Sequence, residues 1–315
     1  MVRKFSSLEA LAMSSDFWAN RKVLITGHTG FKGSWLHLML KSLGANVHGI
    51  ALQPEPNSLF RILDLEGSFT SSNYLDIRSE VELAELIKEI SPEVVFHLAA
   101  QPIVLKGYLN PADTFSTNIT GTINVLESLK SLARKPKAIV VVTSDKCYEV
   151  TKDSKIFSEI DKLGGADPYS ASKASSDHFV RAYYETYDLP VLISNCSNNY
   201  GPFHFPEKLI PLFINNILKS KPLPVYGDGL YTRDWLYVKD HALAIDLVFH
   251  KGVNGETYNI GGFNEWRNID LVKLLCQQMD EKLGNPLGTS ESLITYIKDR
   301  PGHDRRYAID ASKIN

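Results

Sequence analysis

The sequence has little of several features that mark particular protein classes. Its three cysteines, Cys147, Cys196 and Cys276, are too few and too scattered for a disulfide framework, and none forms the CxxC pair typical of zinc or redox sites. No apolar run approaches the roughly 18 residues that a membrane-spanning helix needs. Neither sign of charge dominates, because 34 basic and 36 acidic residues give a net charge of −2. We therefore expect a cytoplasmic protein that binds no metal, nucleic acid or membrane.

The composition and the length are those of a globular protein with more than one hydrophobic core. Hydrophobic residues make up 43% and charged residues 22% of the 315 positions. We expect two lobes, or one large α/β domain with an appended lobe. Residues 1–20 are interpreted as a leader of unknown role, since Arg3 and Lys4 are not followed by the apolar segment of a signal peptide.

Short β-rich runs alternate with segments of helical spacing up to about residue 200. The pattern predicts strands over 23–26, 46–52, 94–98, 138–143 and 191–195, and helices over 80–90, 117–133 and 169–187. Such alternation is typical of an α/β fold with a doubly wound parallel sheet, the Rossmann architecture. After about residue 200, prolines and a Gly-Asp-Gly turn interrupt this alternation of strands and helices. We therefore expect a nucleotide-binding domain over 21–200, with residues 201–315 forming mainly a smaller C-terminal substrate lobe.

A glycine-rich loop joins the first strand to the next helix. Gly27, Gly30 and Gly33 have the spacing of a dinucleotide fingerprint, which allows a tight turn, close approach of a pyrophosphate and close helix–strand packing. The helix N-terminus adds partial positive charge. The loop therefore predicts a nucleotide site.

The choice of nucleotide is less clear from the residues. Gln53 ends the second strand region, where the usual acidic partner of the NAD ribose is missing, but no cation for the extra phosphate of NADP is present either. NAD is favoured by this absence. Asp76, followed by Ile77, could accept from the adenine amino group or could be a solvated turn residue.

Tyr169 and Lys173 are four residues apart in a predicted helix, which places them on one face. A neighbouring lysine favours the phenolate, so we expect the pKa of Tyr169 to fall from about 10 and the side chain to take a proton from a substrate hydroxyl. Tyr-x-x-x-Lys is common by chance. Ser144 and Asp145 strengthen the hypothesis, because they follow a predicted strand at the sheet edge where such folds hold ligands.

From about Phe17 to Asn315 the chain resembles the extended short-chain dehydrogenase/reductases (extended SDRs), and among them the nucleotide-sugar 4,6-dehydratases. The resemblance rests on Thr26-Gly27-x-x-Gly30-x-x-Gly33, His97 to Gln101, Thr117-Asn118-x-x-Gly121-Thr122, Thr143-Ser144-Asp145 and Tyr169-x-x-x-Lys173. Up to about Asp167 the sequence motifs are similar to those of CDP-glucose 4,6-dehydratases. From about Ser175 onward they are similar to those of dTDP-glucose 4,6-dehydratases. We therefore expect a hybrid chain. Members of the family continue past residues 310–313, so we also expect a truncated C-terminus.

The resemblance implies a redox cycle on a nucleotide-diphosphate glucose. Tyr169 removes the proton of the 4-hydroxyl while C4 passes hydride to NAD. A base then removes the C5 proton while an acid protonates the leaving 6-hydroxyl, and hydride returns to C6. Asp145 matches the general acid and Ser144 the hydroxyl that holds O4. As an acid, Asp145 requires a raised pKa.

Lys146 stands where the dTDP type has a glutamate, as in the CDP type, and is the candidate C5 base. A lysine needs a pKa lowered from about 10.4 to 7–8 for this role. We expect His28 to be the neighbouring cation that lowers it. Alternatively, His28 only fills its loop position and Lys146 orients sugar hydroxyls.

The resemblance also implies the binding residues. NAD would be held by Gly27, Thr29, Gly30, Phe31, Lys32, Gly33, Asp76, Ile77, Leu98, Ala99, Ala100, Gln101, Thr117, Tyr169, Lys173 and Asn199. The nucleotide sugar would be held by Ser144, Asn198, Lys208, Leu209, Pro224, Tyr226, Arg233, Asn268, Arg300 and His303. The guanidinium group of arginine can hydrogen-bond to the oxygens of a diphosphate. The sequence motifs of the second half favour a dTDP-sugar over CDP-glucose. A homodimer through helices near 112–133 and 169–187 is implied as well.

Two other functions stay open at this point. A nucleotide-sugar 4-epimerase would share the tyrosine, the lysine and NAD, but it needs no acid to expel water, so Asp145 favours dehydration. A non-catalytic NAD-binding protein could use the same fold, because a fold does not determine a function. His97, on an apolar strand, is interpreted as a core histidine.

Overall fold

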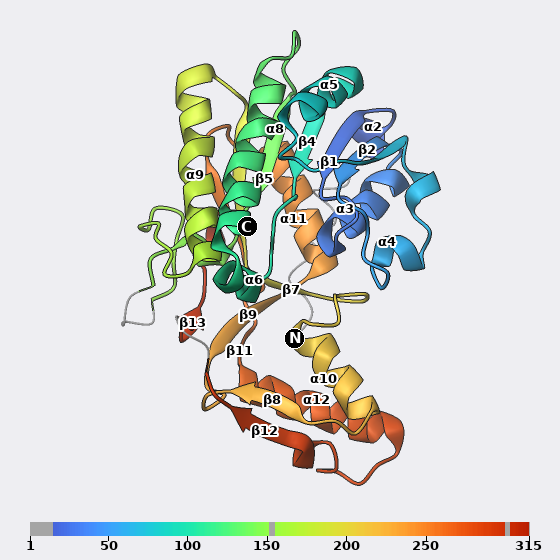
Figure 1. Ribbon diagram of the computed structural model, residues 1–315, viewed down its shortest axis with the longest axis vertical. Coiled ribbons are helices and arrows are strands. Elements are labelled where there is room, and N and C mark those ends of the chain that lie inside the picture. The colour runs from blue at the N-terminus through green and yellow to red at the C-terminus, as the bar shows by residue number, and fades with distance from the viewer. Residues whose placement is uncertain (1–14, 151–154, 300–302, 315) are drawn as a thin grey trace.

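A seven-stranded parallel sheet forms the centre of the computed structural model, which describes residues 15–150, 155–299 and 303–314 (Figure 1). The strand order is β10-β6-β5-β4-β1-β2-β3. The strands are β1 (Lys22–Thr26), β2 (Asn46–Ala51), β3 (Ser71–Tyr74), β4 (Val94–His97), β5 (Ala138–Val142), β6 (Val191–Cys196) and β10 (Thr257–Ile260). The order reverses between β1 and β4, as in the doubly wound dinucleotide-binding fold, so the predicted fold class is confirmed.

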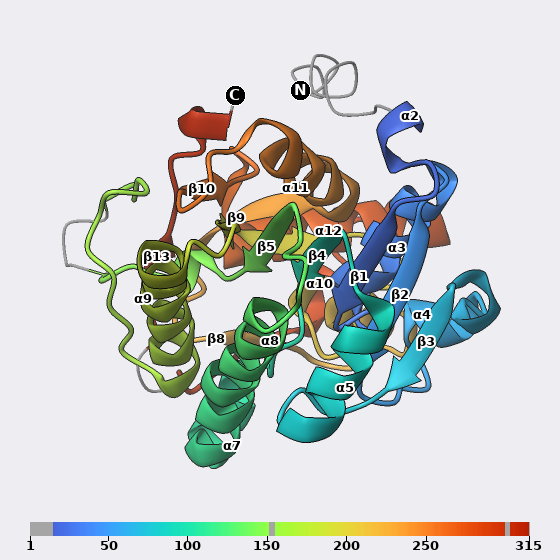
Figure 2. The ribbon, with the colours of Figure 1, turned by 90° about the horizontal axis from the view of Figure 1, so that it is seen from above.

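Helices cover both faces of the sheet (Figure 2). One face carries α5 (Glu80–Ile90), α8 (Gly121–Lys130) and α9 (Pro168–Tyr187), and the other carries α3 (Phe31–Ser42) and α11 (Val238–Lys251). The described helices include none that is both long and apolar enough to cross a membrane.

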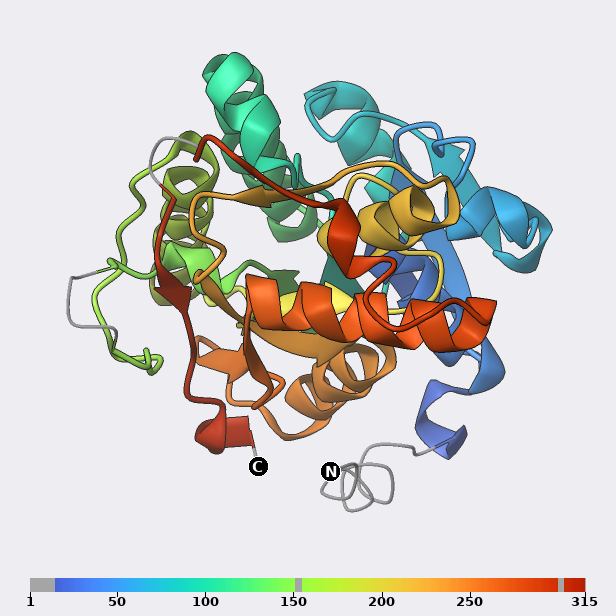
Figure 3. The ribbon, with the colours of Figure 1, turned by 90° about the horizontal axis from the view of Figure 1, so that it is seen from below.

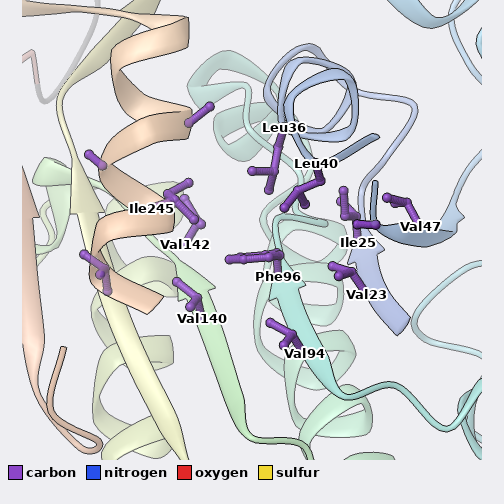
Figure 4. Packing of buried hydrophobic residues seen from close by; sticks show 14 of the residues in the cluster. Val23, Ile25, Leu36, Leu40, Val47, Val94, Phe96, Val140, Val142 and Ile245 are labelled. Carbon is purple, nitrogen blue, oxygen red and sulfur yellow. The ribbon is translucent and has the colours of Figure 1, made fainter. Parts of the chain in front are cut away.

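Alternate residues of each strand point to opposite helical layers. Val23 and Ile25 of β1 pack with Leu36 and Leu40 of α3 (Figure 4), whereas Leu24 belongs to the cluster on the other face. All three β1 residues are completely buried. The apolar strands therefore form a sheet that is covered on both sides, as parallel sheets require.

A smaller lobe lies beneath the sheet (Figure 3). It contains α10 (Leu209–Leu218), α12 (Asn268–Leu283) and the parallel pair β8 (Leu223–Tyr226) and β12 (Ile294–Ile297), which share their own apolar cluster. Strands β7 (Asn198–Tyr200), β9 (Thr232–Tyr237), β11 (Glu265–Arg267) and β13 (Arg306–Tyr307) form a second sheet. The short helices are α2 (Ser15–Trp18), α4 (Leu59–Ile62), α6 (Val104–Leu109) and α7 (Pro111–Phe115).

Three sequence predictions need correction. The boundary at residue 200 does not separate the two parts, because α11 packs on the main sheet and β10 pairs with β6 in it. The leader predicted over 1–20 is not all leader: Trp18 is fully buried and its Nε1 donates to Asp246 Oδ1 at 2.8 Å. The helix predicted over 117–133 is split into a π-helical turn, Ser116–Thr120, and α8. Such turns frequently occur at functional sites.

Candidate active site

The glycine-rich loop packs closely on its surroundings except at Gly30. Gly27 has φ +78°, and a Cβ there would lie 2.8 Å from the Ala99 nitrogen. A Cβ on Gly33 would lie 2.3 Å from the Gly27 oxygen. At Gly30 the same oxygen, 3.2 Å away, is the nearest obstacle within 4 Å. The backbone is therefore open at Gly30, at the N-terminus of α3, where a pyrophosphate would approach.

The loop follows β1 next to β4, where the strand order reverses and a doubly wound sheet binds its ligand. Thr26 pairs in register with His97, whose ring lies 2.7 Å from Thr26 Oγ1 and 2.9 Å from Thr122 Oγ1. Burial lowers the pKa of His97 to about 3, so it is a neutral core histidine, as interpreted from the sequence. Leu98, Ala99, Ala100 and Gln101 lead away from the end of β4.

Three other predicted cofactor residues, Asp76, Thr29 and Asn199, differ in their hydrogen-bond partners. Asp76 accepts two hydrogen bonds of 3.0 Å from Arg78 Nε, and this pairing lowers the pKa of its carboxyl group. Thr29 donates to the Leu52 carbonyl at 3.1 Å. Asn199 Oδ1 is buried with no hydrogen-bond partner among the described residues, so it has an acceptor to offer to a ligand.

Tyr169 and Lys173 project from the first two turns of α9, which Asp167 caps by accepting from Ser170 N at 3.0 Å. Burial lowers the pKa of Lys173 to about 8, and its Nζ donates to the Val142 carbonyl at 3.3 Å. The expected fall of the Tyr169 pKa is not found. Burial raises it, because a phenolate loses its hydration there, and a hydrogen bond with Ser144 opposes the rise.

Asp145 lies beside this pair in the 3₁₀ turn Asp145–Cys147 that follows β5. It is 3% exposed, and burial raises the pKa of its carboxyl group to about 6. The nearby charges of Lys146 and Arg233 and a 3.1 Å hydrogen bond from Ser144 Oγ limit the rise. Asp145 Oδ2 is buried without a partner among the described residues. These properties suit a carboxylic acid that delivers a proton near neutral pH.

Lys146 is not near His28, contrary to the prediction. Its Nζ lies 2.8 Å from the Tyr307 hydroxyl and 3.7 Å from Asp167 Oδ2. His28 lies over β2, where Gly49 leaves room for its ring, and its Nε2 is 2.8 Å from Ser72 Oγ. Three strand spacings, roughly 14 Å, separate β2 from β5. Burial also lowers the pKa of His28 to about 4, so it is neutral and supplies no cation.

Two further residues of the glycine-rich loop reach toward the second half of the chain. The Phe31 ring stacks on His204, with centroids 4.6 Å apart. The Lys32 side chain donates to Cys196 Sγ at 2.9 Å. The loop is therefore fixed to the segment that carries the predicted substrate residues.

The predicted substrate residues come from several elements around the second sheet. Arg233 of β9 is 5% exposed, and its guanidinium carbon lies 4.5 Å from the centroid of the Tyr307 ring. His303 stacks on Tyr231 with centroids 3.8 Å apart. Asn198 is on β7, Lys208 and Leu209 begin α10, Pro224 and Tyr226 are on β8, and Asn268 begins α12. Arg300 lies outside the described residues.

Sequence reasoning did not find Asp167, Asp304 or Tyr307 as parts of the site. Asp167 had a signal, because an acidic residue before Pro168 is typical of a helix start. Tyr307 had none, since it meets Lys146 across 161 residues of chain. Asp304 accepts from the Tyr307 hydroxyl, and its carbonyl accepts from Arg233 at 3.0 Å.

Comparison with known proteins identifies the family. The pattern of the GDP-mannose 4,6 dehydratase family matches residues 24–315. The chain belongs to this family. It is an NAD-binding fold of the extended SDR type, like the solved members to which it is similar.

Curated members of the GDP-mannose 4,6 dehydratase family include close relatives. The chain is 45% identical over 302 residues to a probable dTDP-glucose 4,6-dehydratase of Sinorhizobium fredii and 43% identical over 309 residues to the dTDP-glucose 4,6-dehydratase of Neisseria meningitidis. Each match covers 93% of this chain and 86% of the relative. The similarity spans both halves, so these relatives give no support to a hybrid origin.

Solved structures agree with this assignment. A dTDP-glucose 4,6-dehydratase of Bacillus anthracis in complex with NAD has a TM-score of 0.79 at 39% identity, over 93% of this chain and 88% of that chain. A UDP-glucose 4-epimerase of Thermotoga maritima with UDP-glucose has a TM-score of 0.80 at 26% identity, over 92% and 90%. Dehydratases and epimerases share this fold, so the side chains of the site must distinguish them.

Proposed function

We propose that this protein is an NAD-dependent dTDP-glucose 4,6-dehydratase, which converts dTDP-glucose to dTDP-4-keto-6-deoxyglucose and water. The observation that supports it best is Asp145, a buried carboxyl group with a pKa of about 6 beside Ser144 and Tyr169. A 4-epimerase has no water to expel and no use for such an acid. The curated relatives that match across both halves are dTDP-glucose 4,6-dehydratases.

The residues present fit NAD. The opening at Gly30 admits a pyrophosphate, and the point between β1 and β4 where the strand order reverses is where a doubly wound sheet binds a dinucleotide. The unpartnered oxygen of Asn199, on β7, and the side chain of Lys173, on α9, are the further groups assigned to the cofactor. Bound NAD supplies a hydride acceptor for C4 and a hydride donor for C6.

Tyr169 takes the proton of the 4-hydroxyl in this scheme. Burial favours the neutral phenol, so the phenolate must be stabilised by Lys173 one helical turn away. Ser144 hydrogen-bonds to Tyr169 and, at 3.1 Å, to Asp145. Asp145 gives one proton to O6, and the proton that Tyr169 removes from O4 can pass through Ser144 to replace it. The proton gained at O4 therefore balances the proton lost to O6, and both residues are reset after each turnover.

The C5 proton requires a separate base, and Lys146 is the candidate next to Asp145. Asp167 lies 3.7 Å from its Nζ, and a carboxylate at that distance favours the ammonium form. An ammonium group cannot accept a proton. Lys146 must therefore lose a proton before the C5 step and regain one during it.

Substrate binding is assigned to Arg233 and Lys208 for the diphosphate, with Asn198, Asn268, His303, Arg300, Leu209, Pro224 and Tyr226 around the rest of the nucleotide sugar. Arg233 is buried beside the acid and the base, so it would place the diphosphate next to the reacting sugar. Asn268 Oδ1, like Asn199 Oδ1, is buried without a partner among the described residues. A guanidinium group offers paired donors to phosphate oxygens.

Separate incubation with dTDP-glucose and CDP-glucose tests the proposal. Loss of water from dTDP-glucose, detected by mass spectrometry, is expected, with NAD unchanged at the end. Water loss from CDP-glucose alone would overturn the choice of nucleotide and support the CDP-type resemblance of the first half. A product of unchanged mass with an inverted C4 would indicate a 4-epimerase, and no reaction would indicate a non-catalytic protein.

Assembly as a homodimer in the cytoplasm stays a prediction. Helices α8 and α9 lie together on one face (Figure 2), and α6 and α7 add the exposed side chains of Leu105, Leu109 and Phe115. Light scattering of the purified protein checks the dimer, and Leu109→Glu is the variant expected to weaken it.

A further inference from the structure

The Lys146 side chain is held by groups from two distant parts of the chain. Its Nζ donates to the Tyr307 hydroxyl at 2.8 Å, and it lies 3.7 Å from Asp167 Oδ2. Among the described residues, the charged and titratable groups near it include Asp145 in its own turn, Asp167 before α9 and Tyr307 on β13, with Arg233 on β9 and Asp304 before β13 in contact with Tyr307. The dehydratase proposal gives no use to Tyr307 and Asp304.

The hydrogen bonds through Tyr307 have a direction. Lys146 is the donor, and the Tyr307 hydroxyl passes its own hydrogen on to Asp304 Oδ2. The two hydrogen bonds, from Lys146 to Tyr307 and from Tyr307 to Asp304, are therefore already arranged for a proton to leave the lysine. Tyr307 is 1% exposed, so its hydroxyl is shielded from bulk water.

We propose that Tyr307 and Asp304 form a proton relay that converts Lys146 from an ammonium ion to the neutral amine needed at C5. This inference rests on the proposed dehydratase function. Lys146 gives one proton to the Tyr307 oxygen as Tyr307 gives its hydroxyl proton to Asp304. The products are a neutral lysine, an unchanged tyrosine and a protonated Asp304, so charge and atoms balance. Lys146 then takes the C5 proton and later returns it to C5, after which Asp304 gives its proton back through Tyr307 to Lys146 and the relay is reset.

Arg233 connects the relay to substrate binding. Its guanidinium carbon lies 4.5 Å from the centroid of the Tyr307 ring, and its Nη2 donates to the Asp304 carbonyl at 3.0 Å. A diphosphate bound by Arg233 would therefore sit against both relay residues. Tyr307 acts through Lys146 and is a positioning and relay residue rather than one that touches the sugar.

Tyr307→Phe tests the relay, because it removes the hydroxyl and keeps the ring under Arg233. At neutral pH the variant is expected to lose about 10- to 100-fold in turnover and in incorporation of solvent deuterium at C5. Oxidation at C4 precedes the relay, so NADH absorbance should accumulate after mixing with dTDP-glucose. The ratio of wild-type to variant rate should shrink toward about pH 9, where Lys146 can lose its proton to solvent. Asp304→Asn is expected to behave in the same way.

Tyr258→Phe is the matched control. Tyr258, on β10, is also buried, but its hydroxyl accepts a hydrogen bond from Val253 N at 2.8 Å and none from Lys146. It should keep wild-type kinetics. A Tyr307→Phe defect that is equal at every pH, or no defect in an active enzyme, would overturn the relay alone. A wild-type protein that does not dehydrate dTDP-glucose would overturn the proposed function and the relay with it.

Discussion

Lys32 of the glycine-rich loop donates a 2.9 Å hydrogen bond to the thiol of Cys196 at the end of β6. The contact brings the Lys32 ammonium close enough to Lys173 to lower the pKa of Lys173, after burial, which is the larger cause. Lys32 of the glycine-rich loop and Lys173 of α9 therefore both lie near Cys196. Their repulsion adjusts the protonation of Lys173, the group that stabilises the Tyr169 phenolate in the proposed mechanism.

Replacing Lys32 by methionine should raise the pKa of Lys173 above about 8, because one repelling charge is lost. At saturating NAD, the alkaline limb of the pH–rate profile should move upward by on the order of one pH unit. Lys32→Arg keeps the charge and is the control. An unmoved limb in Lys32→Met would show that the charge of Lys32 does not reach Lys173.

Gly30→Ala and Gly33→Ala should separate cofactor binding from folding. At Gly30 the backbone has φ −80°, and a methyl group meets only a contact of 3.2 Å, so we expect a folded protein with weaker NAD binding. At Gly33 a methyl group would lie 2.3 Å from the Gly27 oxygen, so we expect a loss of stability of about 1–3 kcal/mol. Thermal unfolding and NAD titration check both. Equal NAD affinity in Gly30→Ala would contradict the placement of the pyrophosphate.

Asp145→Asn should lower dehydration by about 10²- to 10⁴-fold, because an amide cannot protonate the leaving hydroxyl. NADH should still form after mixing with dTDP-glucose, since oxidation at C4 does not use this acid. In the wild type, kcat/KM should fall as the pH rises above about 6, where Asp145 loses its proton. Water loss at the wild-type rate in Asp145→Asn would rule out the assigned acid.

Acid should destabilise the protein through its buried histidines. Burial lowers the pKa of His28 to about 4, and of His37, His97 and His204 to about 3. It also holds the pKa of His241 well below its usual range. In the unfolded chain these rings take up protons below pH 6.5, so stability present above that pH is lost as the pH falls toward the folded values. Asp145 and Asp177, with pKa values raised to about 6, oppose this loss, because ionising them costs less stability as the pH falls toward 4.

Urea unfolding between about pH 7 and pH 4 measures how the free energy of unfolding changes with pH. Each histidine should cost about 2 kcal/mol by about pH 5, so the five outweigh the two acids. His97→Gln removes one titrating ring and should reduce the slope of stability against pH, whatever it does to stability at neutral pH. His178→Gln, at an exposed position, is the control for the substitution itself. A slope that His97→Gln does not change would contradict a neutral His97.

The parts of the site that the sequence predicted are local in the chain. The turn at Gly27, the packing at Gly33 and the four-residue spacing of Tyr169 and Lys173 all depend on neighbours within one loop or one helix. Ser144 and Asp145 were found because a parallel sheet brings the ends of its strands to one edge. The predicted fold class needed only the alternation of strands and helices.

The errors arose where distant segments meet. His28 and Lys146 each have an ordinary loop context, and only the strand order places them about three strand spacings apart. The boundary at residue 200 failed because β10 returns to pair with β6, and parallel pairing leaves no local sequence signal.

The sequence by itself determined the doubly wound sheet and the glycine-rich loop, and it indicated the candidate tyrosine, lysine and acid, because short-range spacing specifies each of them. The tertiary structure decided their protonation and their partners. Burial, which depends on the whole packed chain, raises the pKa of Asp145 and lowers that of Lys173. The contact of Lys146 with Tyr307 joins residues 161 positions apart, and only folding brings such side chains together.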